Sequence, residues 1–252
     1  MPLRVTQPTR PPFSPELLTS AKAVVASAGS ATFAPDPLLG PGLSLATSIF
    51  TSVVKRHGNL IESAIAEALE RSDEYIVLRA VTMPITRSAE VLVAGNQSDQ
   101  LRGLSVSCEG PAARAAVFDL IAINIEDEIA TIVEVKRGSG ETELKKRRHT
   151  ENVLRAGQLQ GKAYLRTLGY EVREVNTKII DYYGRSRFKP DLTITQRELD
   201  AYFKVPVVAT VEAVTNVIRR RLHADLPRLI GLVQGDAAEV AYDAFATPAR
   251  VA

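Results

Sequence analysis

Apolar residues recur along the middle of the chain with two different spacings, which predict a mixture of helices and strands. Between Asn59 and Ser72 they fall at positions 60, 61, 64, 65, 68 and 69, along one face of a helix. Further apolar patterns predict strands at 75–84, 91–94, 103–108, 115–124, 128–136, 170–182 and 191–195, and helices at 150–168, 196–203 and 211–222. This order of elements predicts an α/β fold with a mixed central sheet flanked by helices.

The first 44 residues differ from the rest because they contain eight of the fourteen prolines. Proline lacks a backbone N–H and interrupts helices and central strands, so we expect an extended arm around one short helix at 16–26. The regular patterns begin at residue 45 and fade after 222. We therefore expect three segments: a Pro-rich N-terminal arm at 1–44, the α/β domain at 45–225 and a C-terminal extension at 226–252.

The composition narrows the class of protein. With 252 residues, 45% of them hydrophobic, and a net charge of +2, the chain is long and apolar enough to fold around a sizeable core. Its single cysteine, Cys108, excludes a disulfide scaffold and is typical of a reducing compartment. No run of 18 apolar residues occurs, and Lys22 interrupts the first apolar stretch, so we expect a cytoplasmic protein without a membrane span.

The stretch from Val117 to Lys136 contains the most informative chemistry. Two β-rich runs flank an acidic turn, and a turn at Glu126–Asp127 would place Asp119 directly opposite Glu134. Glu134 and Lys136 share a face because side chains alternate along a strand. Buried charges are costly unless they pair or bind a metal, and two carboxylates suit Mg²⁺. The alternative is an ion pair on a half-exposed sheet face.

Asp119 followed after fourteen residues by Glu134-Val135-Lys136 resembles the core of the PD-(D/E)XK nucleases, which include restriction enzymes and many repair nucleases. The resemblance covers about half the chain, from Asn59 to about Tyr183, and implies a restriction-endonuclease-like core. It also implies that Asp119, Glu134 and the Val135 carbonyl bind Mg²⁺, or Mn²⁺ in its place, and that Lys136 acts on the attacking water. Phe118 departs from the family pattern, which often has Pro at this position.

A further acid on the preceding helix would complete such a site. Glu62 and Glu67 each lie about 110° from the centre of the apolar stripe, on opposite edges, whereas Glu70 points away from it. Only one of the two edge acids can face the site. The run from Gly58 to Glu62 resembles the Gly-x-x-x-Glu opening of this helix in the family, which favours Glu62 as a catalytic acid and a metal partner, through water if not directly. The alternative is that both acids are solvated.

Basic residues gather after the Glu-x-Lys strand. Between 136 and 166 the chain has nine basic and three acidic residues, a local net charge of +6, and much of it falls in a predicted loop at 137–149. Such a loop at the mouth of a metal site suits phosphate binding, although a solvated charge run is the alternative. Gln160 and Tyr164 resemble the Gln-x-x-x-Tyr motif of the RecB-type branch, although Tyr164 could instead pack in the core. The predicted nucleic-acid contacts are Lys145, Lys146, Arg147, Arg148, Arg155, Gln160, Lys162 and Tyr164.

Together these features predict a Mg²⁺-dependent nuclease that acts on DNA. Two alternatives stay open: a nuclease-like module that binds DNA or protein without cleavage, and a nuclease subunit that needs a partner. Either end of the chain could serve as a docking surface, through which a homodimer or a larger nuclease complex would form. No Gly-x-x-x-x-Gly-Lys-Ser/Thr or Gly-x-Gly-x-x-Gly motif occurs, so we expect no nucleotide cofactor.

Overall fold

The computed structural model describes residues 13–97, 99–101 and 103–246. The chain divides into two compact units, which are described separately below. A helical unit combines Met1–Leu60 with Val211–Ala252, and a sheet-containing unit is formed by Ile61–Thr210. The boundaries of these units differ from those of the three predicted segments. The division into three segments stays a prediction.

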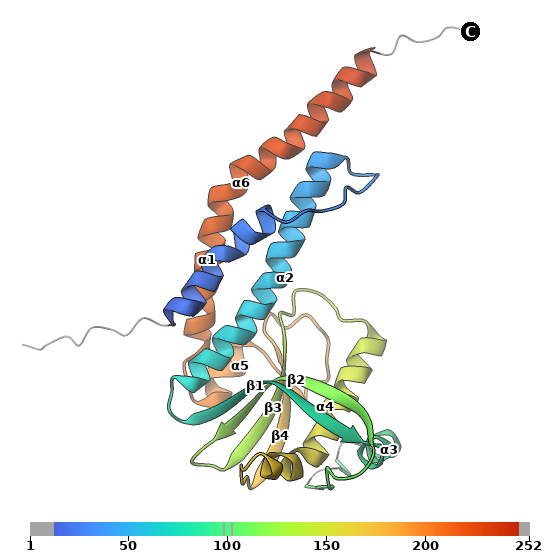
Figure 1. Ribbon diagram of the computed structural model, residues 1–252, viewed down its shortest axis with the longest axis vertical. Helices are drawn as coiled ribbons and strands as arrows, with labels where there is room; N and C mark the ends of the chain where they lie inside the picture. The colour runs from blue at the N-terminus through green and yellow to red at the C-terminus, as the bar shows by residue number, and fades with distance from the viewer. Residues whose placement is uncertain (1–12, 98, 102, 247–252) are drawn as a thin grey trace, which may run out of the picture. The chain divides into compact units, whose positions relative to one another are not determined.

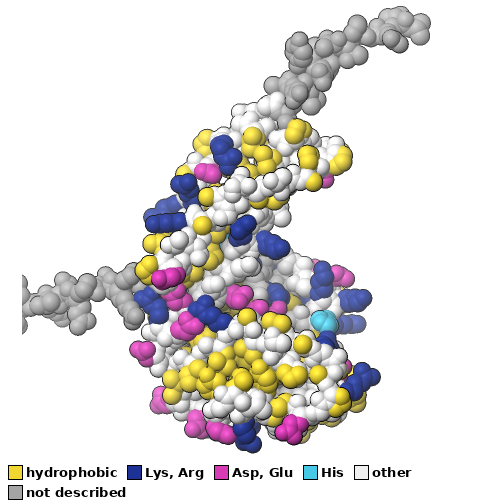
Figure 2. All heavy atoms as spheres, viewed as in Figure 1, with side chains coloured by type: hydrophobic (Ala, Val, Ile, Leu, Met, Phe, Trp, Pro, Cys, Tyr) yellow, Lys and Arg dark blue, Asp and Glu magenta, His cyan; other side chains and the backbone are white. Residues whose placement is uncertain are grey.

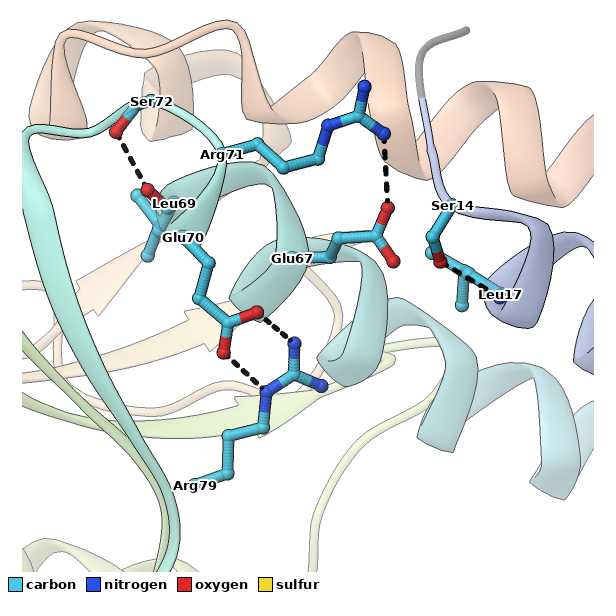
Figure 3. A network of polar contacts seen from close by, with 8 residues as sticks. All are labelled: Ser14, Leu17, Glu67, Leu69, Glu70, Arg71, Ser72 and Arg79. Carbon is cyan, nitrogen blue, oxygen red and sulfur yellow. Dashed lines mark hydrogen bonds and ion pairs between the residues drawn. The ribbon is translucent and has the colours of Figure 1, made fainter.

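The helical unit consists of α1 (Pro15–Gly29), the first part of α2 (Pro41–Glu70) and most of α6 (Val207–Ala246). The helix predicted at 16–26 is confirmed as α1, and Ser14 caps it by accepting a hydrogen bond from the Leu17 N–H at 3.1 Å (Figure 3). Residues 1–12 of the arm predicted at 1–44 lie outside the described residues. Within the described part of the chain, no helix has the length and apolar character required to cross a bilayer.

The sheet-containing unit holds the strands of the described residues (Figure 1). Its elements after α2 are β1 (Tyr75–Thr86), α3 (Arg87–Gly95), β2 (Ala112–Asn124), β3 (Ile129–Lys136), α4 (Leu144–Thr167), β4 (Glu174–Asp181), β5 (Thr193–Ile194) and α5 (Gln196–Phe203). The strands form one open sheet in the order β1-β2-β3-β4-β5, antiparallel from β1 to β3 and parallel from β3 to β5. The predicted α/β fold with a mixed sheet flanked by helices is confirmed.

The hairpin of β2 and β3 has the predicted register. Leu120 pairs with Val133 and Asn124 with Ile129, so Asp119 and Glu134 occupy the next opposed positions beyond the ladder. The turn is wider than the predicted pair, however, since residues 125–128 all lie outside the strands. The side chain of Asn124 closes this loop by accepting a hydrogen bond from the Asp127 N–H at 2.7 Å. The loop is centred where the prediction placed it, and the register is therefore unchanged.

Three predicted elements were wrong. The run 91–94 belongs to helix α3, which Thr86 caps and which buries Ala89 and Val93 one turn apart. The run 103–108 forms no strand where it is described, and its Val106 N–H instead donates to the Leu159 carbonyl of α4 at 2.8 Å. The predicted loop at 137–149 ends early because α4 begins at Leu144, in a run of lysine and arginine residues that favour helices.

Close packing of α4 against the sheet fixes the position of β2. A Cβ atom added at Gly157 would lie 2.6 Å from Cζ of Phe118, and one added at Gly161 would lie 2.8 Å from a methyl carbon of Val175. Only glycine allows the helix to approach the sheet this closely. Phe118 is fully buried in the core cluster, and it directly precedes Asp119.

Candidate functional site

The middle of β2 and the end of β3 bring Asp119, Glu134 and Lys136 together. Oδ2 of Asp119 accepts a hydrogen bond from the Val135 N–H at 2.6 Å, so this carboxylate bonds to the backbone of β3 just beyond the last pair of the ladder. The Lys136 ammonium donates to Oε1 of Glu134, two residues earlier on the same strand. The Glu134 side chain is 17% exposed and that of Lys136 is 36% exposed, so the ion pair lies at the edge of the buried region.

Electrostatics couple the acids of this site. Burial raises the pKa of Asp119, while the Val135 N–H and the Lys136 ammonium oppose that rise. Burial and the negative charge of Asp119 raise the pKa of Glu134, against the lowering effect of Lys136. Both carboxyl groups therefore hold their protons more tightly than a free side chain does. A cation placed between them would reverse this effect.

Glu62, on the last part of α2, belongs to the same cluster. Its pKa is raised by burial first and then by the negative charges of Asp119 and Glu134, whereas Arg79 and Lys136 lower it. Glu67 pairs instead with Arg71, one helical turn later, at 3.3 Å (Figure 3). The charge of Glu62 is therefore coupled to the hairpin carboxylates.

Glu70 lies on the exposed part of α2, as its position on the helical wheel predicts. Its carboxylate forms a two-pronged ion pair with Arg79 of β1, with Nε–Oε1 and Nη2–Oε2 distances of 2.8 and 2.6 Å (Figure 3). The guanidinium that Glu70 holds is the same one that lowers the pKa of Glu62. Glu70 therefore affects the site only through Arg79.

The backbone beside Asp119 is strained. In the pairing of β1 with β2, Arg79 faces Leu120 and Val81 faces Phe118, so Ala80 occupies the position opposite Asp119. Ala80 has a φ of 49°, in the left-handed region that a residue with a Cβ adopts at a cost of about 1–2 kcal/mol. Backbone strain of this kind often accompanies a functional site.

The positions of β2 that face the core cluster change from even-numbered to odd-numbered residues at the same point. Ala116 and Phe118 belong to the core cluster before it, and Ile121 and Ile123 belong to that cluster after it. A regular strand keeps one parity, so the pleat is interrupted between Phe118 and Ile121. Asp119 lies at this interruption.

A cavity of about 250 Å³ opens beside Glu134, between the first half of β2 and the start of α4. Arg114 and His149 line it together with Glu134, and their side chains approach one another to 3.5 Å. Arg114 is also paired with Glu90 of α3 at 2.6 Å. Arg114 and His149 could not be predicted as lining residues from the sequence, because neither belongs to a motif and they are 35 residues apart.

The basic run of Lys145, Lys146, Arg147 and Arg148 lies in the first two turns of α4 rather than in a loop. Lys145 and Arg148 are exposed, whereas Arg147 is held by the carbonyl of Arg187 and by Glu141. The positive end of the helix dipole adds to these charges, and this combination favours an anion. Basic and acidic side chains are interspersed on the face that Figure 2 shows.

The other four predicted nucleic-acid contacts lie further along α4. Gln160 is fully buried: its Oε1 accepts from the Thr86 N–H at 3.0 Å and its Nε2 donates to the Ser107 carbonyl at 3.2 Å. Tyr164 donates its hydroxyl to the carbonyl of Thr82 at 3.0 Å and packs partly against the core. Gln160 thus joins elements of the fold and has no exposed surface to offer a DNA strand. Arg155 and Lys162 line a different cavity, on the β4 side of α4.

The fit of a metal ion depends on the available oxygen ligands. Among the described residues, no group of three or more His, Cys, Asp or Glu side chains is arranged to hold a metal ion. Mg²⁺ nonetheless needs only one or two carboxylates, since it keeps several of its waters. Asp119 and Glu134 provide that pair, and burial together with the Asp119 charge raises the pKa of Glu134, which a divalent cation would offset. The donor set therefore fits Mg²⁺ or Mn²⁺.

Comparison of the chain with protein-family models, with curated proteins and with solved structures finds no match. The candidate site therefore depends on the geometry and electrostatics of the chain itself.

Proposed function

We propose that this chain is a Mg²⁺-dependent DNA nuclease with a restriction-endonuclease-like core of the PD-(D/E)XK type. The observation that carries the proposal is the electrostatic coupling of Glu62, Asp119 and Glu134 beside Lys136. Like charges held together in a partly buried site are unfavourable without a cation, and they are the arrangement that metal-dependent phosphodiester hydrolysis requires. Perturbed pKa values of this kind mark candidate functional sites.

In this proposal Asp119, Glu134 and the Val135 carbonyl hold the metal ion, and Glu62 binds it directly or through water. Bound Mg²⁺, or Mn²⁺ in its place, supplies positive charge that lowers the pKa of a water and shields phosphate oxygens. Lys136 is already positioned by Glu134 and reaches the solvent-exposed edge of the site. Its ammonium can orient the attacking water and stabilise negative charge on the phosphate.

DNA would approach through the first turns of α4. The exposed side chains of Lys145 and Arg148, together with the positive end of the helix dipole, offer phosphate contacts there. Arg114 and His149 line the cavity beside Glu134. A cytoplasmic location, a homodimer or larger nuclease complex, and independence from any nucleotide cofactor remain predictions.

The test is cleavage of supercoiled and linear DNA by the purified chain with Mg²⁺, with Mn²⁺ and with a chelator. We expect metal-dependent cleavage that Asp119→Asn and Glu62→Gln reduce. Glu67→Gln is the matched control, because Glu67 lies on the same helix but pairs with Arg71. Full activity in Asp119→Asn, or equal losses in the two glutamate variants, would contradict the proposed site.

A second candidate function is a nuclease-like module that binds DNA or protein without cleaving it. The Lys136–Glu134 ion pair favours this candidate, because it compensates part of the negative charge without a metal. Salt-sensitive DNA binding with no cleavage, unaffected by Asp119→Asn, would support it. Cleavage that appears only after addition of a cellular extract, and still needs Asp119, would instead identify a nuclease subunit that depends on a partner.

A further inference from the structure

A larger cavity, of about 630 Å³, lies on the β4 side of α4. It shares no lining residue with the cavity beside Glu134. Arg155, Gln158 and Lys162 of α4 form one wall, and the first half of β4 forms another. Among the described residues, β5 pairs with β4 at Ile179 and Ile180 alone, so the first half of β4 has no neighbouring strand on this side.

Positive charge dominates the lining of this cavity. Arg155, Lys162, Arg173 and Lys178 contribute four cations, against two acids. The ammonium of Lys162 donates to the carbonyl of Arg173 at 3.3 Å, and that of Lys178 donates to the carbonyl of Asp191 at 2.8 Å. Within the described part of the chain, Arg155 is the one cation of the four that has a carboxylate within 4 Å. The four cations and the two acids leave the lining with a net charge of +2.

Arg155 is largely buried, with only 11% of its side chain exposed. Its Nη2 lies 3.6 Å from Oδ2 of Asp191, which is too far for a hydrogen bond. The same nitrogen is inaccessible to solvent and has no hydrogen-bond partner among the described residues. Buried guanidinium donors are normally satisfied, and a shift of this side chain toward the cavity would allow an anionic oxygen to satisfy this one.

The remaining lining is suited to a small organic group. Leu104, which is 48% exposed, provides apolar surface, and Gln158 and Asn176 provide amides beside it. The Gln158 amide is itself fixed, since its Nε2 donates to the Val175 carbonyl at 3.1 Å. The volume falls in the range of about 300–1,000 Å³ that is typical of small-molecule sites. The cations suit a phosphate group, and the apolar surface beside them suits a ring attached to that phosphate.

We propose that this cavity binds a phosphate-bearing small molecule of about nucleotide size. The phosphate contacts the cations of α4 and β4, and the ring packs against the apolar surface. The inference goes beyond the proposed nuclease activity and does not require it, because the two cavities lie on different sides of α4. A strand of DNA is the alternative occupant, and the test distinguishes the two.

The test is calorimetric titration of the full chain with AMP in the presence of a chelator, which keeps the carboxylate site free of metal. AMP is expected to bind, and adenosine, which lacks the phosphate, to bind at least about tenfold more weakly. Lys162→Gln and Lys178→Gln should each weaken AMP binding by at least about tenfold, whereas Lys55→Gln, which removes an exposed charge of α2, should not. Circular dichroism verifies that each variant is folded.

Two results would overturn the inference. One is that neither AMP nor inorganic pyrophosphate binds to the folded chain. The other is that single-stranded DNA binds through Lys162 and Lys178 while AMP does not compete with it, which would assign the cavity to a nucleic-acid strand. Asp119→Asn should lose DNA cleavage but bind AMP as the wild type does. Failure of the nuclease proposal and failure of this proposal can therefore be told apart.

Discussion

Replacement of Gly157 by alanine tests how α4 positions the β2 strand that carries Asp119. The new Cβ would lie 2.6 Å from Cζ of Phe118 and 3.2 and 3.3 Å from two further ring atoms. Phe118 is completely buried, so its ring has little room to move. Either the ring or the helix must shift. Because Phe118 directly precedes Asp119, the shift is transmitted to the candidate site.

Two opposing effects decide the magnitude. Alanine in a helix interior is favoured over glycine by about 1 kcal/mol. Overpacking of a filled core costs about 1–3 kcal/mol, and three contacts below 3.4 Å on a buried ring place this case in the upper half of that range. We therefore expect a net loss of about 1–2 kcal/mol in the free energy of unfolding. For a protein of this size, the loss corresponds to a fall in Tm of about 2–8 °C.

Thermal unfolding followed by circular dichroism measures this change, and DNA cleavage measures its effect on the site. Gly95→Ala is the control, since the added Cβ at the end of α3 meets no atom within 4 Å. That variant should match or slightly exceed the wild-type Tm. If Gly157→Ala were as stable as Gly95→Ala, the close contact between α4 and Phe118 would not exist.

Three further predictions follow from the contacts around the site. Because the folded-state pKa of Glu62 is raised above 4.5, its proton stabilises the fold at low pH, and that contribution is lost as the pH rises. Glu62→Gln should therefore raise the Tm of the metal-free protein at about pH 7.5. A gain in Tm that did not shrink toward about pH 4.5 would refute this prediction. Gln160→Leu should lower the free energy of unfolding by about 1–3 kcal/mol without changing DNA affinity, because it leaves the buried Thr86 N–H unpaired. If the variant were as stable as the wild type in denaturant titration, that result would count against this hydrogen bond. Mg²⁺ should raise the Tm of the wild-type chain in thermal scans but not that of Asp119→Asn, and equal shifts would place the metal elsewhere.

The pairing of Asp119 with Glu134 could be predicted because a single acidic turn separates two apolar runs. A one-residue slip would move every apolar side chain to the other face of the sheet, so the pattern fixes the register. The turn itself is four residues rather than two, and it depends on the Asn124 side chain. The coupling of Glu62 to these acids agrees with the helical wheel but needed the structure to distinguish two edges of one stripe.

Other features depend on contacts that no local pattern contains. The run 91–94 is rich in valine, which favours strands, but the Thr86 cap and the burial of Ala89 make it part of a helix. Gln160 looked like a surface residue because its partners are 74 and 53 residues away along the chain. Arg114 and His149 meet only because α4 packs beside β2. Tertiary contacts decide each of these cases.

The measurement that tests the central claim most directly is the rate of Mg²⁺-dependent DNA cleavage by the wild-type chain and by Lys136→Ala. In the proposed mechanism Lys136 acts on the water and the phosphate, and loss of such a group typically slows a reaction by about 10²–10⁴-fold. We predict a fall of that size, with Lys55→Ala cleaving at the wild-type rate. Equal rates for the wild type and Lys136→Ala, or no cleavage by the wild type with either Mg²⁺ or Mn²⁺, would contradict the account.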